Sequence, residues 1–124
     1  MAPKVHLIDG DAAIRAALTF SLELENFEVK SYESAEQVLG QEPLPRTGCL
    51  VIDWRLPGMD GLECLARLRN RGVSLPAIIM TSTPSRALRT RASAAGAIII
   101  EKPLLCDALT QAIRHELSLG RIAA

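Results

Sequence analysis

The sequence carries no net charge and no long apolar run, and both absences exclude classes of protein. Fourteen lysine and arginine residues balance fourteen acidic ones, so no charge excess would draw the domain to nucleic acid or to a membrane surface. No segment approaches the ~18 consecutive apolar residues of a membrane span. The apolar stretch near the N-terminus is also too short for a secretory signal peptide. We therefore expect a cytoplasmic domain that itself binds neither nucleic acid nor membrane.

Cysteine is scarce, and repeats and low-complexity segments are absent. The three cysteines, Cys49, Cys64 and Cys106, lie far apart within apolar patterns and form no Cys-x-x-Cys motif. We interpret them as reduced thiols of a hydrophobic core. At 124 residues, 48% of them hydrophobic, the chain has room for one globular domain over residues 1–124 but not for a second.

What the sequence does contain is a regular alternation of short apolar runs and amphipathic segments. The apolar runs predict strands at 5–9, 27–32, 48–54, 76–82 and 97–101. The amphipathic segments predict helices at 11–25, 34–40, 60–72, 85–96 and 106–117. Continuous aliphatic strands are typical of a parallel sheet that helices cover on both faces. We therefore expect an α/β fold with a doubly wound, five-stranded parallel sheet and five helices.

Polar side chains follow most of the predicted strands at the point where each strand ends. They are Asp9 with Asp11, Asp53, Thr81 with Ser82, and Lys102. In a doubly wound sheet, ligands bind at the carboxyl ends of the strands. Carboxylates, a hydroxyl group and a lysine at one edge provide the groups that hold a divalent cation such as Mg²⁺ and a phosphoryl group.

Each of these residues also has an ordinary structural interpretation. Asp9 or Asp11 could cap the helix that follows. Thr81 could hydrogen-bond locally at its strand end, and Lys102 could be a solvated loop lysine. Asp53 is harder to explain in this way, because an acid at the end of an apolar strand is desolvated at a cost unless a cation compensates it.

Separated segments of the chain resemble the receiver domain of two-component response regulators, in the same order and spacing over nearly the whole chain. They are LIDGD (7–11), VIDWRLPGMDG (51–61), TS (81–82) and EKP (101–103). The segments YESAEQVL (32–39) and EKP are most similar to the NarL/FixJ-type branch. The resemblance implies a flavodoxin-like fold with strand order 2-1-3-4-5.

The resemblance also implies a role for each polar residue. Asp53 would be the phosphoacceptor, whose carboxylate attacks the phosphorus of a phosphohistidine on a histidine kinase. Thr81 and Lys102 would bind the incoming phosphoryl group. The implied magnesium ligands are Asp9, Asp11, Asp53 and the backbone carbonyl of Arg55. Such a domain is not a conventional enzyme, although it assists its own phosphorylation and dephosphorylation.

Two positions depart from the family's pattern. Receivers usually carry two adjacent acids after the first strand, the second being a direct metal ligand, and this chain has Gly10 there. An aromatic switch residue is expected three residues before the lysine, but this chain has Ile99, in a segment that is one residue shorter than the family norm. We expect weaker Mg²⁺ binding and a switch that does not use an aromatic rotamer in that strand.

These departures leave an alternative function open. A pseudo-receiver would keep the fold and bind partners without phosphorylation. We favour a working phosphoacceptor because Asp53, Thr81 and Lys102 all remain. A flavin-binding electron carrier would share the architecture, but the loop after the first strand lacks the Ser/Thr-rich turn that cradles a phosphate.

Charge is unevenly distributed along the chain. Residues 67–102 carry seven basic side chains and one acid, which indicates either a solvated face or a partner surface. By resemblance, the fourth helix, fifth strand and fifth helix would contact an output domain or a second copy. The fourth helix has only a thin inward stripe, made of Leu88, Ala92 and Ala95. We therefore expect it to pack shallowly, and its outward arginines are Arg86, Arg89 and Arg91.

Overall fold

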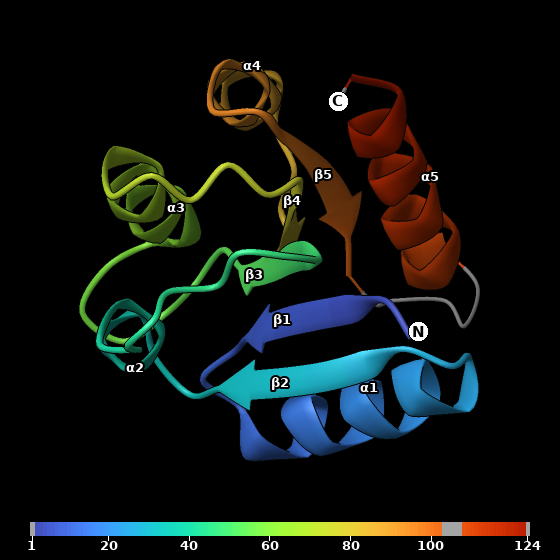
Figure 1. Ribbon diagram of the computed structural model, residues 1–124. Coiled ribbons are helices and arrows are strands. Elements are labelled where there is room, and N and C mark those ends of the chain that lie inside the picture. Colours follow the sequence, from blue (N-terminus) through green and yellow to red (C-terminus); the bar gives the residue numbers. More distant parts are fainter. Residues whose placement is uncertain (1, 103–107, 124) are drawn as a thin grey trace.

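The computed structural model describes residues 2–102 and 108–123, the last four of these by their backbone only. It is a parallel sheet with helices on both faces (Figure 1). The strands are β1 (Lys4–Ile8), β2 (Glu28–Tyr32), β3 (Cys49–Asp53), β4 (Ala77–Thr81) and β5 (Ala97–Glu101). The helices are α1 (Ala12–Leu24), α2 (Ala35–Leu39), α3 (Gly61–Asn70), α4 (Arg86–Ala94) and α5 (Ala108–Ala123).

The predicted elements are confirmed, with one difference in length. Every other element begins and ends within two residues of its predicted bounds, whereas α5 continues to Ala123 instead of ending at residue 117. No proline follows residue 117, and the single glycine there costs a helix only ~1 kcal/mol, so nothing stops it earlier. The predicted start of this helix at Cys106 lies outside the described residues. Within the described residues, no helix is both long and apolar enough to cross a membrane.

The strand order is β2-β1-β3-β4-β5 with parallel pairing throughout, as the resemblance implied. Ile8 lies opposite Ile52 in the register of β1 and β3, so the residues that follow these strands emerge side by side. The chain passes from β1 outward to β2 and then returns to β3 on the other side of β1. This reversal of strand order is where doubly wound folds bind their ligands.

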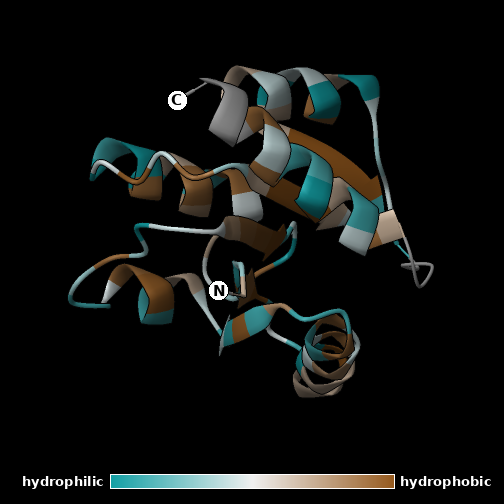
Figure 2. Ribbon diagram, turned by 45° about the vertical axis from the view of Figure 1, so that its right-hand side comes forward, coloured by the Kyte–Doolittle hydropathy of each residue, from teal (hydrophilic) through white to brown (hydrophobic). Residues whose placement is uncertain are grey.

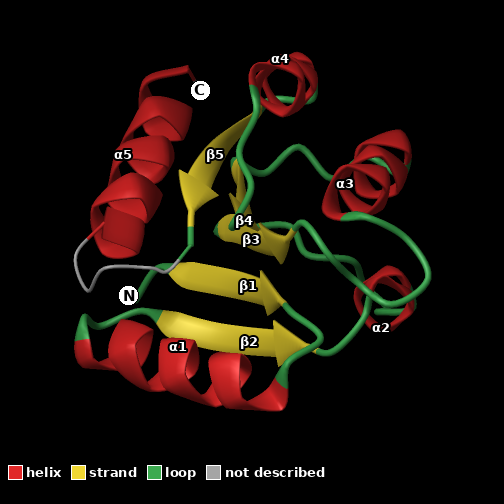
Figure 3. Ribbon diagram, turned by 180° about the vertical axis from the view of Figure 1, so that it is seen from behind, coloured by secondary structure: helices red, strands yellow, loops and turns green. Residues whose placement is uncertain are grey.

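The two faces of the sheet are covered by different helices. Helices α2, α3 and α4 lie on one face and α1 and α5 on the other (Figures 1 and 3). Apolar colour is concentrated on the inner strands, whereas the helices carry both apolar and polar colour (Figure 2). Leu65 of α3 and Ile113 of α5 are fully buried, one on each side. The sheet is therefore held rigidly from both faces, and its carboxyl edge is a fixed platform.

The structure describes two of the three cysteines that the sequence analysis interprets as reduced core thiols. Cys49 and Cys64 are both free and fully buried. Burial raises the pKa of Cys49 to about 12 and that of Cys64 to about 11, so both remain protonated and unreactive near neutral pH. The interpretation is confirmed for these two, while Cys106 lies outside the described residues.

Candidate functional site

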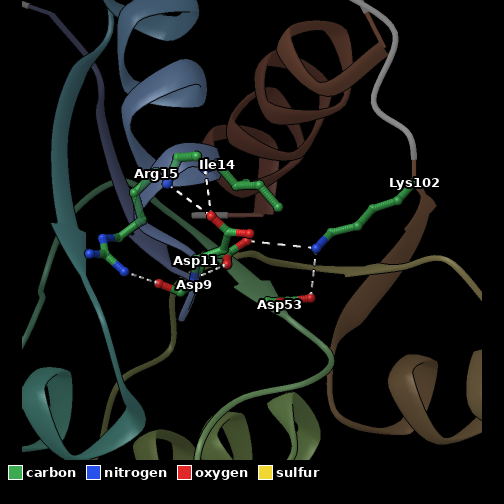
Figure 4. A network of polar contacts seen from close by, with 7 residues as sticks. Asp9, Asp11, Ile14, Arg15, Asp53 and Lys102 are labelled. Atoms are coloured by element: carbon green, nitrogen blue, oxygen red, sulfur yellow. Dashed lines mark hydrogen bonds and ion pairs between the residues drawn. The ribbon is translucent and has the colours of Figure 1, made fainter.

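At the carboxyl edge of the sheet, the acid that follows β1, the last residue of β3 and the lysine that follows β5 come into contact. Figure 4 shows the Lys102 side chain reaching between the two carboxylates. Its Nζ lies 3.0 Å from Oδ1 of Asp53 and 3.7 Å from Oδ2 of Asp9. The backbone N–H of Lys102 donates to the backbone oxygen of Thr81 at 2.8 Å. Lys102 is therefore the compensating cation that an acid at the end of β3 requires.

Asp9 is fully buried and only partly satisfied. Its Oδ1 accepts the backbone N–H of Asp11 at 2.9 Å, and its backbone oxygen accepts Nη1 of Arg15 at 2.7 Å. Its Oδ2 has no hydrogen-bond donor among the described residues. Burial raises the pKa of Asp9 and the nearby charge of Asp53 adds to this, whereas the Asp11 amide and Lys102 lower it. Such an orphaned carboxylate oxygen is a natural position for a cation.

Asp11 serves the local structure of α1. Its Oδ1 accepts the backbone N–H groups of Ala13 at 2.9 Å and Ile14 at 3.2 Å, and it is the N-cap of the helix. The capping interpretation, which the sequence left open for either acid, therefore applies to Asp11 and not to Asp9. Figure 4 shows the Asp11 side chain beside the first turn of α1, as an N-cap requires.

The backbone after Asp53 is fixed by hydrogen bonds and by a glycine. The N–H of Trp54 donates to the oxygen of Met80 at 2.8 Å, and the oxygen of Trp54 accepts the N–H of Gly61 at 2.8 Å. A Cβ atom at Gly61 would lie 2.5 Å from the backbone oxygen of Asp53. Only glycine therefore lets α3 begin this close to the acid. The predicted ligand position Arg55 lies in this loop, with its side chain exposed.

A small cavity of 80 Å³ opens in front of Asp53. Its lining residues are Asp53, Trp54, Arg55, Thr81, Ser82 and Lys102. Thr81 is buried, and its Oγ1 accepts the backbone N–H of Thr83 at 3.1 Å, which is the local hydrogen bond that its structural interpretation expects. Because that bond uses a lone pair, the hydroxyl proton remains able to donate. The cavity has about the volume of two or three water molecules, the scale of the oxygens of a phosphoryl group.

The larger hollows of the described structure lie elsewhere. Hollows of 420 and 410 Å³ flank the loop at 41–47 and contain none of the predicted site residues. Residues of β2 line the first of them, and the residues that follow α3 line the second. Size therefore does not identify the site, whereas the convergence of opposite charges does.

The residues present fit a divalent cation only in part. Asp9 and Asp53 offer two hard carboxylates, and one oxygen of Asp9 is without a hydrogen bond. However, no three His, Cys, Asp or Glu side chains in the described part of the chain gather into a metal site. A bound Mg²⁺ would thus depend on two carboxylates, a backbone oxygen such as that of Arg55, and water. A third carboxylate is lacking at Gly10, the position where receivers usually carry an acid.

Trp54 lines the cavity, although no motif in the sequence assigns it a role. Its position directly after Asp53 is the one signal that could have indicated it, because adjacent residues at a strand end share one loop. Its ring also lies beneath Arg91 of α4, with the guanidinium carbon 5.7 Å from the ring centroid. A residue of the cavity therefore touches the fourth helix.

The chain is similar to known proteins in sequence and in fold. The sequence profile of the response regulator receiver domain matches residues 5–114. The chain is 35% identical over 116 residues to the transcriptional regulatory protein FixJ of Rhizobium meliloti. The aligned region covers 90% of this chain and 57% of that protein. It is 41% identical over 121 residues to FixJ of Azorhizobium caulinodans, covering 96% of this chain and 56% of that protein. The chain thus spans less than three fifths of the length of either relative.

Solved structures agree with the sequence relatives. Full-length FixJ from B. japonicum superposes with a TM-score of 0.88 at 34% identity, over 98% of this chain and 60% of that one. The structure of FixJ-N superposes with a TM-score of 0.85 at 34% identity, over 95% of both chains. Taken with the strand order and the acids and lysine at its carboxyl edge, the profile match means that this chain belongs to the response regulator receiver domain family, with relatives of the NarL/FixJ type.

Proposed function

We propose that this receiver domain accepts a phosphoryl group on Asp53 from a histidine kinase and thereby alters a surface that a partner reads. The observation that carries the proposal is the contact of 3.0 Å between Nζ of Lys102 and Oδ1 of Asp53, at the mouth of a cavity that Thr81 also lines. A nucleophile, a fixed cation and a hydroxyl group thus surround a space of suitable size.

The chemistry follows from the position of each group. Lys102 holds one oxygen of Asp53 and so orients the carboxylate, whose other oxygen attacks the phosphorus of a phosphohistidine. An O–P bond forms, the N–P bond breaks, and the imidazole leaves with the electron pair. The ammonium of Lys102 and the hydroxyl of Thr81 would bind the transferred oxygens. Mg²⁺, held by Asp9, Asp53 and the carbonyl of Arg55, would offset charge on the same oxygens.

The domain would act on itself rather than on a separate substrate. The cavity is open to solvent, and Asp53 is 9% exposed, so water can reach an acyl phosphate there. The same cations that assist phosphorylation then assist hydrolysis. The cytoplasmic location expected from the sequence belongs to this proposal as well, because a phosphohistidine donor and Mg²⁺ must both reach the domain.

The proposed partners are a histidine kinase and an output domain or a second copy of the chain. The FixJ relatives are named transcriptional regulatory proteins and are longer than this chain, which supports an output domain as the responding partner. The contact surface would be α4, β5 and α5. Arg86 and Arg89 on α4 are exposed, and neither has a carboxylate within ion-pair distance among the described residues.

The pseudo-receiver remains the second candidate, and Gly10 is the observation that favours it. Without the second acid, the described residues contain no three-side-chain metal site. A domain that binds Mg²⁺ too weakly would keep its partner surface but would not be phosphorylated.

Intact mass after incubation with Mg²⁺ and acetyl phosphate tests the proposed function. The wild-type chain should gain one phosphate, and Asp53→Asn should gain none, because the amide is not a nucleophile. Asp60→Asn is the matched control, since Asp60 is an N-cap outside the cavity and asparagine caps equally well. A wild-type chain that gains no phosphate, or an Asp53→Asn variant that gains one, would overturn the assignment.

A further inference from the structure

Trp54 connects the cavity to α4. It follows Asp53 directly, its backbone is held by hydrogen bonds to Met80 and Gly61, and it lines the cavity. Its side chain is partly buried against the core on the α3 and α4 side of the sheet. The guanidinium of Arg91 covers the ring at 5.7 Å, within the range of a cation–π contact.

Arg91 adds a contact to the small apolar anchor of α4. Only Leu88 and Ala92 of this helix are buried. Arg91 is exposed and makes no ion pair within the described residues. Its guanidinium therefore depends on the Trp54 ring for a partner. A helix with so small an apolar anchor responds to the movement of any one contact.

Strand β5 has no aromatic side chain that could connect the cavity with α4. Position 99 of β5 is isoleucine, buried to 9% exposure in the core that α4 covers, and a β-branched side chain has few rotamers to exchange. The sequence has only four aromatic residues, Trp54, Tyr32, Phe20 and Phe27. Of these, Trp54 alone lines the cavity.

We infer that the stacking of Arg91 on Trp54 carries the state of Asp53 to α4. The inference rests on the proposed phosphorylation of Asp53. A phosphoryl group that occupies the cavity of 80 Å³ makes new contacts with its lining. Trp54 is part of that lining, so its ring shifts beneath Arg91, and the weakly anchored helix follows. Trp54 and Arg91 are thus positioning residues for the response of α4 and take no part in the chemistry.

Arg91→Ala tests this route, with Arg89→Ala as the matched control, because Arg89 is exposed on the same helix and has no aromatic partner in the described structure. Each protein is compared with and without Mg²⁺ and beryllofluoride, a mimic of the phosphoryl group. The readouts are amide hydrogen exchange of α4 and the fluorescence of Trp54, which is the sole tryptophan of the chain. Phosphate gain from acetyl phosphate is measured in parallel.

The wild-type chain and Arg89→Ala should change both the α4 exchange and the Trp54 emission. Arg91→Ala should gain phosphate as the wild type does, but should lose at least half of the change in α4 exchange. Arg91→Lys, which keeps a cation over the ring, should restore part of it. A full α4 response in Arg91→Ala, or a phosphorylated wild type with unchanged Trp54 emission, would overturn the inference. A wild type that gains no phosphate would instead overturn the proposed function, and this inference with it.

Discussion

At the scale of single residues, Asp9 and Asp11 show how position decides the role of an acid. They are two residues apart, yet Asp9 is fully buried with an orphaned oxygen, whereas Asp11 is exposed and caps α1. A buried carboxylate beside Asp53 costs stability in the absence of a metal, because desolvation and like charge both oppose its ionisation. The same features make it suited to bind a cation. Stability and binding therefore oppose each other at Asp9.

Asp9→Asn should raise stability without metal and abolish the stabilisation that Mg²⁺ gives. Since the pKa of Asp9 is raised in the folded chain, protonated Asp9 favours folding at low pH, and that contribution is lost as pH rises through the raised pKa. Asparagine keeps the acceptor for the Asp11 amide. At pH 7 in EDTA the variant should be more stable by on the order of 1 kcal/mol, and its stability should depend less on pH.

Urea unfolding at several pH values between 4 and 7, with EDTA or with Mg²⁺, measures both effects. The wild type should gain stability with Mg²⁺ by mass action, and the variant should gain little. If the wild type in EDTA were the more stable protein at pH 7, the raised pKa of Asp9 would be wrong.

Gly10→Asp should tighten Mg²⁺ binding severalfold and destabilise the metal-free protein. The aspartate adds a hard oxygen ligand, and its charge repels Asp9 and Asp53 when no metal is bound. A Cβ atom at Gly10 would lie 3.3 Å from Cδ of Pro57, so the proline ring must move by a few tenths of an ångström.

Titration of Mg²⁺, followed by Trp54 fluorescence, compares the wild type with Gly10→Asp and Gly10→Ala. The alanine variant carries the same Cβ contact with Pro57 but no carboxylate, and it should bind as the wild type does. Equal affinities in all three proteins would show that the existing acids already complete the site.

At the scale of the elements, α4 differs from its neighbour α3 in how firmly it is held. Helix α3 buries five residues, and α4 buries only Leu88 and Ala92. In addition, Arg69 of α3 donates to the backbone oxygens of Val73 and Leu75 in the loop that follows α3. It also donates to the backbone oxygen of Ala95, the C-cap of α4, so one hydrogen bond ties the end of α4 to α3. The predicted inward stripe of α4 and its shallow packing are confirmed, because they depend only on the spacing of its apolar residues.

Amide hydrogens of α4 should therefore exchange faster than those of α3 in the unmodified protein. Less buried apolar area means a smaller free energy of local opening. Hydrogen exchange with mass spectrometry on peptides from the two helices measures this, with α3 as the internal reference of similar length. Exchange in α4 as slow as in α3 would contradict a weakly anchored helix.

The elements also show what the sequence can and cannot predict. Strands such as 76–82 and helices such as 60–72 follow from local periodicity, and their order follows from the alternation. The ends of the strands predicted the meeting of Asp53 and Lys102. The contact of Arg91 with Trp54 joins residues 37 positions apart and depends on how α4 packs, which no local pattern contains. The choice of Asp11 as cap depends likewise on burial.

At the scale of the whole molecule, the basic segment 67–102 does not form one uniform surface. Arg67 pairs with Glu63 at 3.2 Å, and Arg69 and Arg71 donate to backbone oxygens. Arg91 stacks on Trp54, and Lys102 faces the acids. Arg86 and Arg89 remain exposed on α4. The charge imbalance of the sequence is thus divided between internal structure, the site and a small part of the proposed partner surface.

The architecture gathers the residues of the site where the strand order reverses, on a sheet held from both faces. The central claim is that the carboxylate of Asp53 becomes an acyl phosphate. Borohydride reduces such an anhydride to an alcohol, which converts the aspartate to homoserine. Trypsin releases residues 47–55 as the peptide TGCLVIDWR, in which Asp53 is the only acidic side chain.

Peptide mapping after treatment with acetyl phosphate, Mg²⁺ and borohydride is therefore the most direct measurement. The account predicts homoserine at position 53 and unchanged aspartate in the peptide that contains Asp9 and Asp11. Homoserine at position 9 or 11, or at no position despite a gain of phosphate, would contradict it.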